Sequence, residues 1–260
     1  MLNQLNGCQS QGLAGAPTHV DLGELDVTTE FDCIEVRECG GDGEEGMKCL
    51  EEGLCAEKAV RYLVEAVKLH PKFTNTRGRS GRPTFDVAVL VLDRPVSFNT
   101  YIQPVCLPTP ETATTSFDFP NQQMVVKGWG NVVLGFGEQQ SATVLQELRG
   151  LKEISLEDEG NIRGCQTLLG SLVQLDSYHM CVWKNGSEPA NGCQGDSGGP
   201  VSRLHRTSVT DIGNWELAGL VSFGVTRACG SKTPLIVTRV ADPEILSFIR
   251  DEIDSNRTEK

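Results

Sequence analysis

The decapeptide "NGCQGDSGGP", which runs from Asn191 to Pro200, is the stretch that decides the fold and the chemistry of this chain. A nucleophilic serine has to stand in a tight turn beside backbone N–H groups that face a developing oxyanion. Ser197 lies between Gly195 and Gly198, and glycine permits that close approach of the backbone. We therefore predict the N–H groups of Gly195 and Ser197 as the oxyanion donors. An ordinary turn of Gly, Asp and Ser is the alternative interpretation.

The composition indicates a globular protein and excludes several kinds of partner. With 260 residues and 38% hydrophobic content, the chain can form one large all-β domain or two small ones. A net charge of −12 argues against binding to nucleic acid or to an anionic membrane, and leaves soluble, peptide-like partners. No apolar run approaches the roughly 18 residues that a membrane span needs. The opening residues lack the pattern of a signal peptide.

Ten cysteines, without CxxC pairs or Cys/His ligand spacing, favour disulfides in an oxidising compartment over a zinc site. Two N-x-S/T sequons, at Asn185 and Asn256, point to the same compartment. We predict a secreted protein that needs no metal or other cofactor, and whose natural N-terminus differs from Met1.

Residues 21–57 contain thirteen acidic and two basic residues together with four cysteines. This composition predicts a long acidic surface loop that is stapled to itself. A nested arrangement suggests Cys33–Cys55 and Cys39–Cys49, although connectivity does not follow from sequence alone. We favour a solvated charged face over a calcium site, because a count of carboxylates fixes no coordination geometry.

Short apolar stretches separated by Gly, Pro and polar loops predict a β-barrel or β-sandwich. The clearest strand is 87–92, with Asp86 at its mouth, and "MVVKGWG", "LVSFGV" and "PLIVTRV" continue the pattern. One helix is predicted over 242–253, with Asp242 as its cap and Pro243 in its first turn. Its apolar face contains Ile245, Leu246, Ile249 and Ile253. The tail "DSNRTEK" is expected to fray.

From about Val20 to Ile253, these segments resemble in order those of the trypsin/chymotrypsin-like (S1) serine proteases. The resemblance is carried by "DLGELD", "FDVAVLVLDRPV", "QPVCLP", "KGWG", "MCVW", "GDSGGP", "SFG" and "PLIVTRV". The acidic, cysteine-bearing segment and "CLP" resemble the clip-domain proteases of arthropod cascades.

The resemblance implies an all-β fold of two packed six-stranded Greek-key β-barrels, the first incomplete, with a C-terminal α-helix. We expect a single S1 peptidase-like domain over 1–260 that lacks its N-terminal strands. About 1–100 would be the rest of the first barrel, about 101–241 the second barrel and 242–253 the helix. Missing strands would open an edge in the first barrel, so we expect aggregation or poor expression.

By resemblance, Ser197 is the nucleophile that forms the acyl-enzyme, Asp86 orients the base, and Ser222 supports Asp86. In the family, the Asp of "GDSGG" pairs with an α-amino group freed by cleavage at an "IVGG"-like site. This chain has no such site, so Asp196 is predicted to stabilise its loop without that partner, as in an immature zymogen. The resemblance also implies the disulfides Cys193–Cys229 and Cys165–Cys181, which leaves Cys8 and Cys106.

The family's general base comes from a "TAAHC" segment, and this chain has none. We interpret His19, His70, His179 and His205 as structural histidines. Loss of the base costs roughly six orders of magnitude in rate, so the chain as written is expected to be nearly inert.

Three hypotheses follow. The first is a serine endopeptidase represented without its N-terminal histidine segment, and the intact "GDSGGP" and Asp86 favour it. The second is a non-catalytic homologue that binds or regulates proteases of an extracellular cascade. A plain disulfide-rich adhesion domain, the third, explains the cysteines but not the ordered motifs.

The resemblance also predicts the substrate pocket. Asn191 stands where the trypsin branch has an Asp, and a neutral amide forfeits the charge-assisted pair that selects Arg or Lys. Leu235 replaces a pocket glycine, and its isobutyl group would fill much of the space. We therefore expect a weak preference for small or medium apolar P1 residues in protein or peptide substrates. The other predicted pocket residues are Gly192, Ser222, Phe223 and Gly224.

Overall fold

The computed structural model describes a large part of the chain, and every structural statement below refers to that part. The described residues are 16–40, 48–75, 82–109, 124–133, 139–153, 165–167, 169–170, 174–183, 192–205, 213–224 and 233–258.

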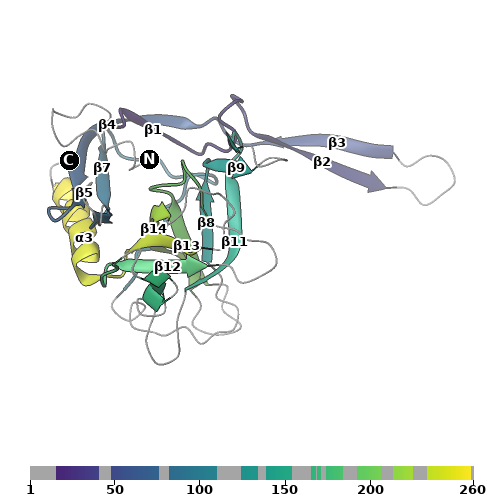
Figure 1. Ribbon diagram of the computed structural model, residues 1–260. Helices are drawn as coiled ribbons and strands as arrows, with labels where there is room; N and C mark the ends of the chain where they lie inside the picture. Colours follow the sequence, from purple (N-terminus) through teal and green to yellow (C-terminus); the bar gives the residue numbers. More distant parts are fainter. Residues whose placement is uncertain are drawn as a thin grey trace.

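The named elements among these residues are fifteen strands and a C-terminal helix (Figure 1). The first half of the chain contributes β1 (His19–Leu22), β2 (Cys33–Gly40), β3 (Lys48–Cys55), β4 (Val60–Leu69), β5 (Thr74–Asn75), β6 (Pro83–Thr84) and β7 (Ala88–Leu92). The second half contributes β8 (Met124–Gly128), β9 (Asn131–Val133), β10 (Gln139–Ser141), β11 (Gln146–Glu153), β12 (His179–Trp183), β13 (Pro200–His205), β14 (Asn214–Gly224), β15 (Leu235–Arg239) and the helix α3 (Pro243–Thr258).

Six strands of the second half form a closed antiparallel barrel, in the order β11-β12-β15-β14-β13-β8. The strands are rich in aliphatic residues because their inner faces fill one core, which includes Val126, Leu151, Val182, Val201 and Val237. The strand after "NGCQGDSGG", β13, is part of this wall, so the barrel anchors the serine loop.

The first half contains a smaller, three-stranded antiparallel sheet in the order β1-β4-β7. The predicted strand over 87–92 is observed as β7, and Asp86 lies two residues before it. In the described part of the chain, β1 and β7 each pair only with β4. The sheet therefore has two open edges there.

A long hairpin of β2 and β3 projects from the body of the molecule (Figure 1). Its strands pair over eight residues, from Cys33 opposite Cys55 to Gly40 opposite Lys48, and the disulfide Cys33–Cys55 closes its root. The expectation of an acidic loop was therefore wrong in its secondary structure. Because the cysteines are equally spaced on the two strands, both cysteine pairs fall in antiparallel register, and a ladder forms between them.

Helix α3 begins as predicted but extends further. The Asp242 carboxylate accepts hydrogen bonds from the N–H groups of Glu244 and Ile245, at 3.0 and 3.4 Å. The helix continues to Thr258, so the expectation of a frayed tail from Asp254 was wrong. Neither Gly nor Pro interrupts this tail, and the Asn256 side chain bonds the Glu252 carbonyl within the added turns. Ile253 is an exposed member of the predicted apolar face, whereas Phe248 is buried.

A series of ring contacts joins the first sheet, the barrel and the helix. The His70 ring stacks on Phe85 at 4.7 Å between centroids, and Phe85 stacks on Tyr178 at 4.1 Å. His70 also meets Phe248 of α3 edge-on. These rings adjoin the cluster in which Val87, Val240 and Ile245 are buried. The helix thus covers the junction of the two halves.

The prediction of a mostly β fold with a C-terminal helix is confirmed, while the division into two six-stranded barrels stays a prediction. Among the described helical segments, none has both the length and the apolar character to cross a bilayer.

Candidate active site

Ser197 lies in a turn that is tied to β14 by backbone hydrogen bonds. The Gly198 N–H donates to the Val221 carbonyl at 2.7 Å, and the Val221 N–H donates to the Gly199 carbonyl at 2.9 Å. Gly195 and Gly198 have φ of +103° and +83°, a backbone region that residues with a Cβ rarely adopt. Ser197 is itself buried, at 8% exposure.

The orientation of the peptide before Gly195 bears on the oxyanion donors. The Asn131 N–H donates to the Gln194 carbonyl at 2.8 Å. In a trans peptide the C=O and the following N–H point in opposite directions, so the Gly195 N–H points away from Asn131. The hydrogen bond to Asn131 therefore fixes the Gln194–Gly195 peptide through its carbonyl and does not use the Gly195 N–H, which faces away from β9.

The Asp196 carboxylate is held by two backbone donors. The Gly130 N–H donates to Oδ1 at 2.9 Å, and the Cys193 N–H donates to Oδ2 at 2.7 Å. A Cβ on Gly130 would lie 2.4 Å from the carboxylate, and one on Gly128 would lie 2.3 Å from Oδ1. The "KGWG" segment thus has glycines where the carboxylate needs space. Sequence reasoning used this segment only as a landmark and missed its role as the receptor of Asp196.

A cavity of about 130 Å³ opens beside Asp196. Its lining includes Gly128, Gly130, Asn131 and Gly192, together with Gln146 and Glu147 at the start of β11. A carboxylate at the wall of a cavity favours a cationic group inside it. The sequence predicted that Asp196 lacks a charged partner, but it gave no signal for this space.

Asp86 and Ser222 meet across the junction between the two halves. The Ser222 hydroxyl donates to Asp86 Oδ2 at 2.6 Å, and the Thr238 hydroxyl donates to the Asp86 carbonyl at 2.9 Å. Asp86 is buried at 7% exposure, and this burial raises its pKa above the ordinary 3.8, while the hydrogen bond from Ser222 opposes the rise. Since Ser222 follows Val221, the acid and the serine loop contact adjacent residues of β14.

The four histidines lie in structural settings. His70 and His179 are buried, which lowers the pKa of each, and each Nδ1 accepts a backbone N–H, from Lys72 at 3.2 Å and from Asp176 at 3.1 Å. His19 belongs to β1 and His205 ends β13. Within the described residues, none of the four hydrogen-bonds Asp86.

The described members of the predicted pocket meet between β14 and β15. Leu235 pairs with Gly224 in the barrel and is 3% exposed. A Cβ on Gly192 would lie 3.3 Å from Cδ2 of Leu235, so the isobutyl group packs against this backbone. Ser222 and Phe223 are also buried, and the Phe223 ring meets His179 edge-on at 5.9 Å. Asn191 lies outside the described residues.

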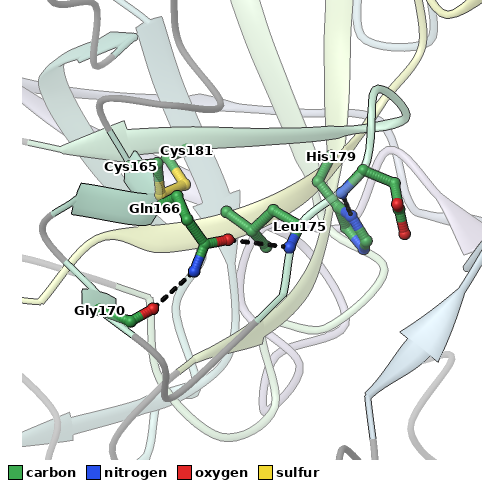
Figure 2. Close-up of a disulfide and its surroundings, with 7 residues drawn as sticks. Cys165, Gln166, Gly170, Leu175, His179 and Cys181 are labelled. Atoms are coloured by element: carbon green, nitrogen blue, oxygen red, sulfur yellow. Dashed lines mark hydrogen bonds between the residues drawn. A yellow bond between two sulfur atoms is a disulfide. The ribbon is translucent and has the colours of Figure 1, made fainter.

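Two of the predicted disulfide pairs, Cys33–Cys55 and Cys165–Cys181, are present. Figure 2 shows the second beside Gln166, whose amide donates to the Gly170 carbonyl and accepts the Leu175 N–H at 3.2 Å. Cys193 is disulfide-bonded, and Cys106 is a free, exposed thiol.

Several of the predicted cysteine and glycosylation positions lie outside the described residues or are described only in part. Cys8, Cys229 and Asn185 lie outside the described residues, and Cys39 and Cys49 are described by backbone register alone. Asn256 lies on α3. Over the described ranges, no group of three or more His, Cys, Asp or Glu residues is arranged to hold a metal ion.

Comparison with known proteins gives consistent matches. A family model described as Trypsin matches residues 56–249. Serine protease ea of Drosophila melanogaster is 32% identical over 238 residues, which cover 91% of this chain and 52% of that relative. CLIP domain-containing serine protease B15 of Anopheles gambiae is 32% identical over 193 residues, which cover 74% of this chain and 46% of that relative.

Among solved structures, the Grass clip serine protease of the Drosophila Toll pathway aligns with a TM-score of 0.62 and 25% identity. The alignment covers 92% of this chain and 57% of that chain. The chain spans about half the length of the curated relatives it matches.

Proposed function

The chain belongs to the trypsin family of serine proteases, and on that premise we propose that it is part of a secreted serine endopeptidase that forms an acyl-enzyme on Ser197. Its sequence is also similar to insect clip-domain serine proteases. The observation that carries the proposal is the Ser222–Asp86 hydrogen bond beside the Ser197 loop. A buried carboxylate next to a nucleophilic serine is the arrangement that orients a general base between them.

In this mechanism, Ser197 Oγ attacks the scissile carbonyl of a protein substrate, and a histidine from a segment outside this chain accepts its proton. The histidine then gives this proton to the leaving amine as the C–N bond breaks, and water hydrolyses the resulting acyl-enzyme. The Asp86 carboxylate would accept a hydrogen bond from the other ring N–H of that histidine, while the Ser222 hydroxyl keeps the carboxylate oriented. The Gly195 and Ser197 N–H groups would bind the oxyanion. The direction of the Gly195 N–H, away from Asn131, supports this role.

Asp196 has the role of fixing the Ser197 turn. The cavity beside its carboxylate offers room for the α-amino group that proteolytic activation frees in this family. Two backbone donors hold the Asp196 carboxylate at the wall of this cavity. This supports a Ser197 loop whose conformation is close to that of the proteolytically activated form.

The packing of Leu235 against Gly192 supports a shallow substrate pocket. A buried isobutyl group leaves no depth for a long side chain, and Asn191 would offer no charge to a basic one. We therefore propose a weak preference for small or medium apolar P1 residues. Disulfides in the described chain support secretion.

A second candidate is a non-catalytic homologue that binds proteases of an extracellular cascade. It is favoured by one observation: among the described residues, no histidine of this chain hydrogen-bonds Asp86. In this alternative, the same fold would serve binding alone.

The test is to express this chain joined to the segment encoded upstream of it, to activate the product by limited proteolysis, and to measure hydrolysis of peptide substrates varied at P1. We expect hydrolysis that Ser197→Ala reduces by roughly 10⁶-fold and that is fastest for small apolar P1 residues. This chain alone should give background rates. If the activated longer protein neither hydrolyses substrates nor reacts with a fluorophosphonate at Ser197, the non-catalytic alternative holds.

A further inference from the structure

Arg82 lies against the substrate pocket that is predicted at the end of β14. Its guanidinium carbon is over the face of the Phe223 ring, 5.1 Å from the ring centroid. Phe223 follows Ser222, the residue whose hydroxyl bonds Asp86. The ring is fixed in place, because it is buried and meets His179 edge-on. Arg82 therefore brings a positive charge next to the residues that would bind a substrate.

The charge of Arg82 has no carboxylate partner in the described part of the chain. None of the ion pairs found there includes it. Arg94 shows the paired form of the same arrangement, since its guanidinium lies 4.3 Å from the Tyr62 centroid and also contacts the Asp93 carboxylate at 2.9 Å. A guanidinium on a ring face keeps N–H donors at its edge, where they can meet a planar carboxylate. Arg82 has the ring contact without the acid.

The backbone that carries Arg82 is held by the short β5–β6 ladder. Arg82 comes directly before Pro83, and a following proline restricts a residue to extended conformations. Pro83 pairs with Asn75, and the hydroxyls of Thr84 and Thr74 are hydrogen-bonded at 2.7 Å. The side chain thus starts from a fixed point, which lowers the entropy that is lost when it binds a ligand.

The edge of β14 beside the serine loop is open over its last residues. β13 pairs with β14 as far as Leu220, and Val221 then bonds Gly198 and Gly199 of the serine loop. Beyond Val221, no strand of the described chain pairs with this edge. An extended peptide can add a strand to such an edge. A substrate bound in this way would lie beside Ser197.

The direction of the added strand decides which part of the substrate meets Arg82. β14 runs from Val221, at the serine loop, to its end at Gly224. Antiparallel pairing is the commoner kind, and a peptide antiparallel to β14 runs from Gly224 towards the serine loop. The residues that precede the scissile bond would therefore lie beside Phe223 and Gly224, next to the Arg82 guanidinium.

The segment around Arg82 is basic, although the chain is acidic. Residues 66–85 contain five Lys or Arg residues and no Asp or Glu, whereas the whole chain has a net charge of −12. Positive charge at a binding site attracts a carboxylate and repels Lys or Arg. The chemistry that suits this site is therefore an acidic side chain.

We propose that Arg82 is a specificity-determining residue that binds an acidic substrate side chain on the N-terminal side of P1. The guanidinium, stacked on Phe223, presents its free edge to the carboxylate of Asp or Glu. This inference rests on the proposed endopeptidase function and adds a substrate class to it. The class is peptides with an acidic residue shortly before a small or medium apolar P1 residue.

The experiment uses the activated longer protein of the preceding test and peptides with a small apolar P1 residue. Glu and Gln are compared in turn at P2, P3 and P4, so that only the charge changes. At one of these positions we expect kcat/KM for the Glu peptide to exceed that for the Gln peptide about fivefold, and the ratio to fall as salt is added.

The variants separate the charge of Arg82 from its packing. Arg82→Gln should remove the preference for Glu, whereas Arg82→Lys should retain a preference in the same direction because it keeps the charge. The matched control is Arg94→Gln, which removes one guanidinium from another aromatic ring and should leave the Glu-to-Gln ratio unchanged. Cooperative melting of each variant confirms that it is folded.

Two kinds of failure can be told apart. Equal rates for Glu and Gln at all three positions, or a preference that survives Arg82→Gln, would overturn the inference and leave the proteolytic function standing. If no peptide is hydrolysed, the proteolytic function fails, and binding of the same labelled peptides to the Ser197→Ala form is measured by fluorescence anisotropy. About fivefold tighter binding of a Glu peptide that Arg82→Gln abolishes would then support the acidic subsite. Equal or absent binding would overturn it.

Discussion

At the scale of single residues, Asp86 shows how burial and a hydrogen bond compete. Burial raises the pKa of this carboxyl above 3.8, and the Ser222 hydroxyl stabilises its ionised form. In the unfolded chain the pKa returns to its ordinary value. Between the two values the folded chain therefore binds more protons than the unfolded chain, and the free energy of unfolding falls as pH rises.

Asp86→Asn should abolish this dependence. The measured quantity is the difference in free energy of unfolding between the original chain and Asp86→Asn. We expect this difference to decrease as pH rises from below 3.8 through the raised pKa of Asp86. The decrease should be about 1.4 kcal/mol for each unit by which the pKa is raised. Urea unfolding across this pH range measures it, with Asp251→Asn on exposed helix surface as the control for loss of one charge. A difference that is flat or grows with pH would contradict the pKa direction.

At this scale, the sequence motifs predicted the side chains that the chemistry would use, and they missed the backbone groups that hold one of those side chains in place. Ser197, Asp86 and Ser222 could be predicted as site residues because their motifs are specific. The structure places Asp86 against Ser222, and the catalytic roles stay a prediction. The receptor of the Asp196 carboxylate could not be found, because its donors are backbone N–H groups 66 and 3 residues away. Every residue except proline has a backbone N–H, so the sequence does not show which ones act as donors. The only sign in the sequence is a glycine, such as Gly130, that leaves space for the acceptor.

At the scale of secondary structure, the hairpin shows what cysteine spacing predicts and what it does not. Equal spacing of the cysteines on the two strands fits nested pairs, and the register has Cys33 opposite Cys55 and Cys39 opposite Cys49. The strands themselves were missed, because glutamate and glycine are poor strand formers. Here the tertiary constraint of the root disulfide outweighs local propensity.

The N-terminal cap of α3 is a second feature at this scale. Asp242→Ala should lower the free energy of unfolding by about 1 kcal/mol, because two N–H groups of the first turn lose their acceptor. Chemical denaturation measures the loss. Asp251→Ala, in the same helix but on its exposed surface, should cost much less. Equal losses for both variants would mean that the cap does not stabilise the helix.

At the scale of the whole molecule, the closed barrel and the open sheet differ in their tendency to associate. The edges of β1 and β7 offer unpaired backbone groups in the described part of the chain, and such edges template further strands. We expect the chain by itself to self-associate as its concentration rises, and more so at high salt, which screens its net charge of −12. Sedimentation velocity at low and high salt measures this. A monodisperse monomer that melts cooperatively under both conditions would contradict the expectation.

The rings that join the two halves also give the molecule an optical property. His70 and Phe85 come from the first half, Tyr178 and His179 from the barrel and Phe248 from the helix. Aromatic side chains in fixed asymmetric packing produce near-ultraviolet circular dichroism, whereas secondary structure alone does not. A near-ultraviolet signal from Tyr178 therefore reports the docking of the two halves on each other, separately from the folding of each.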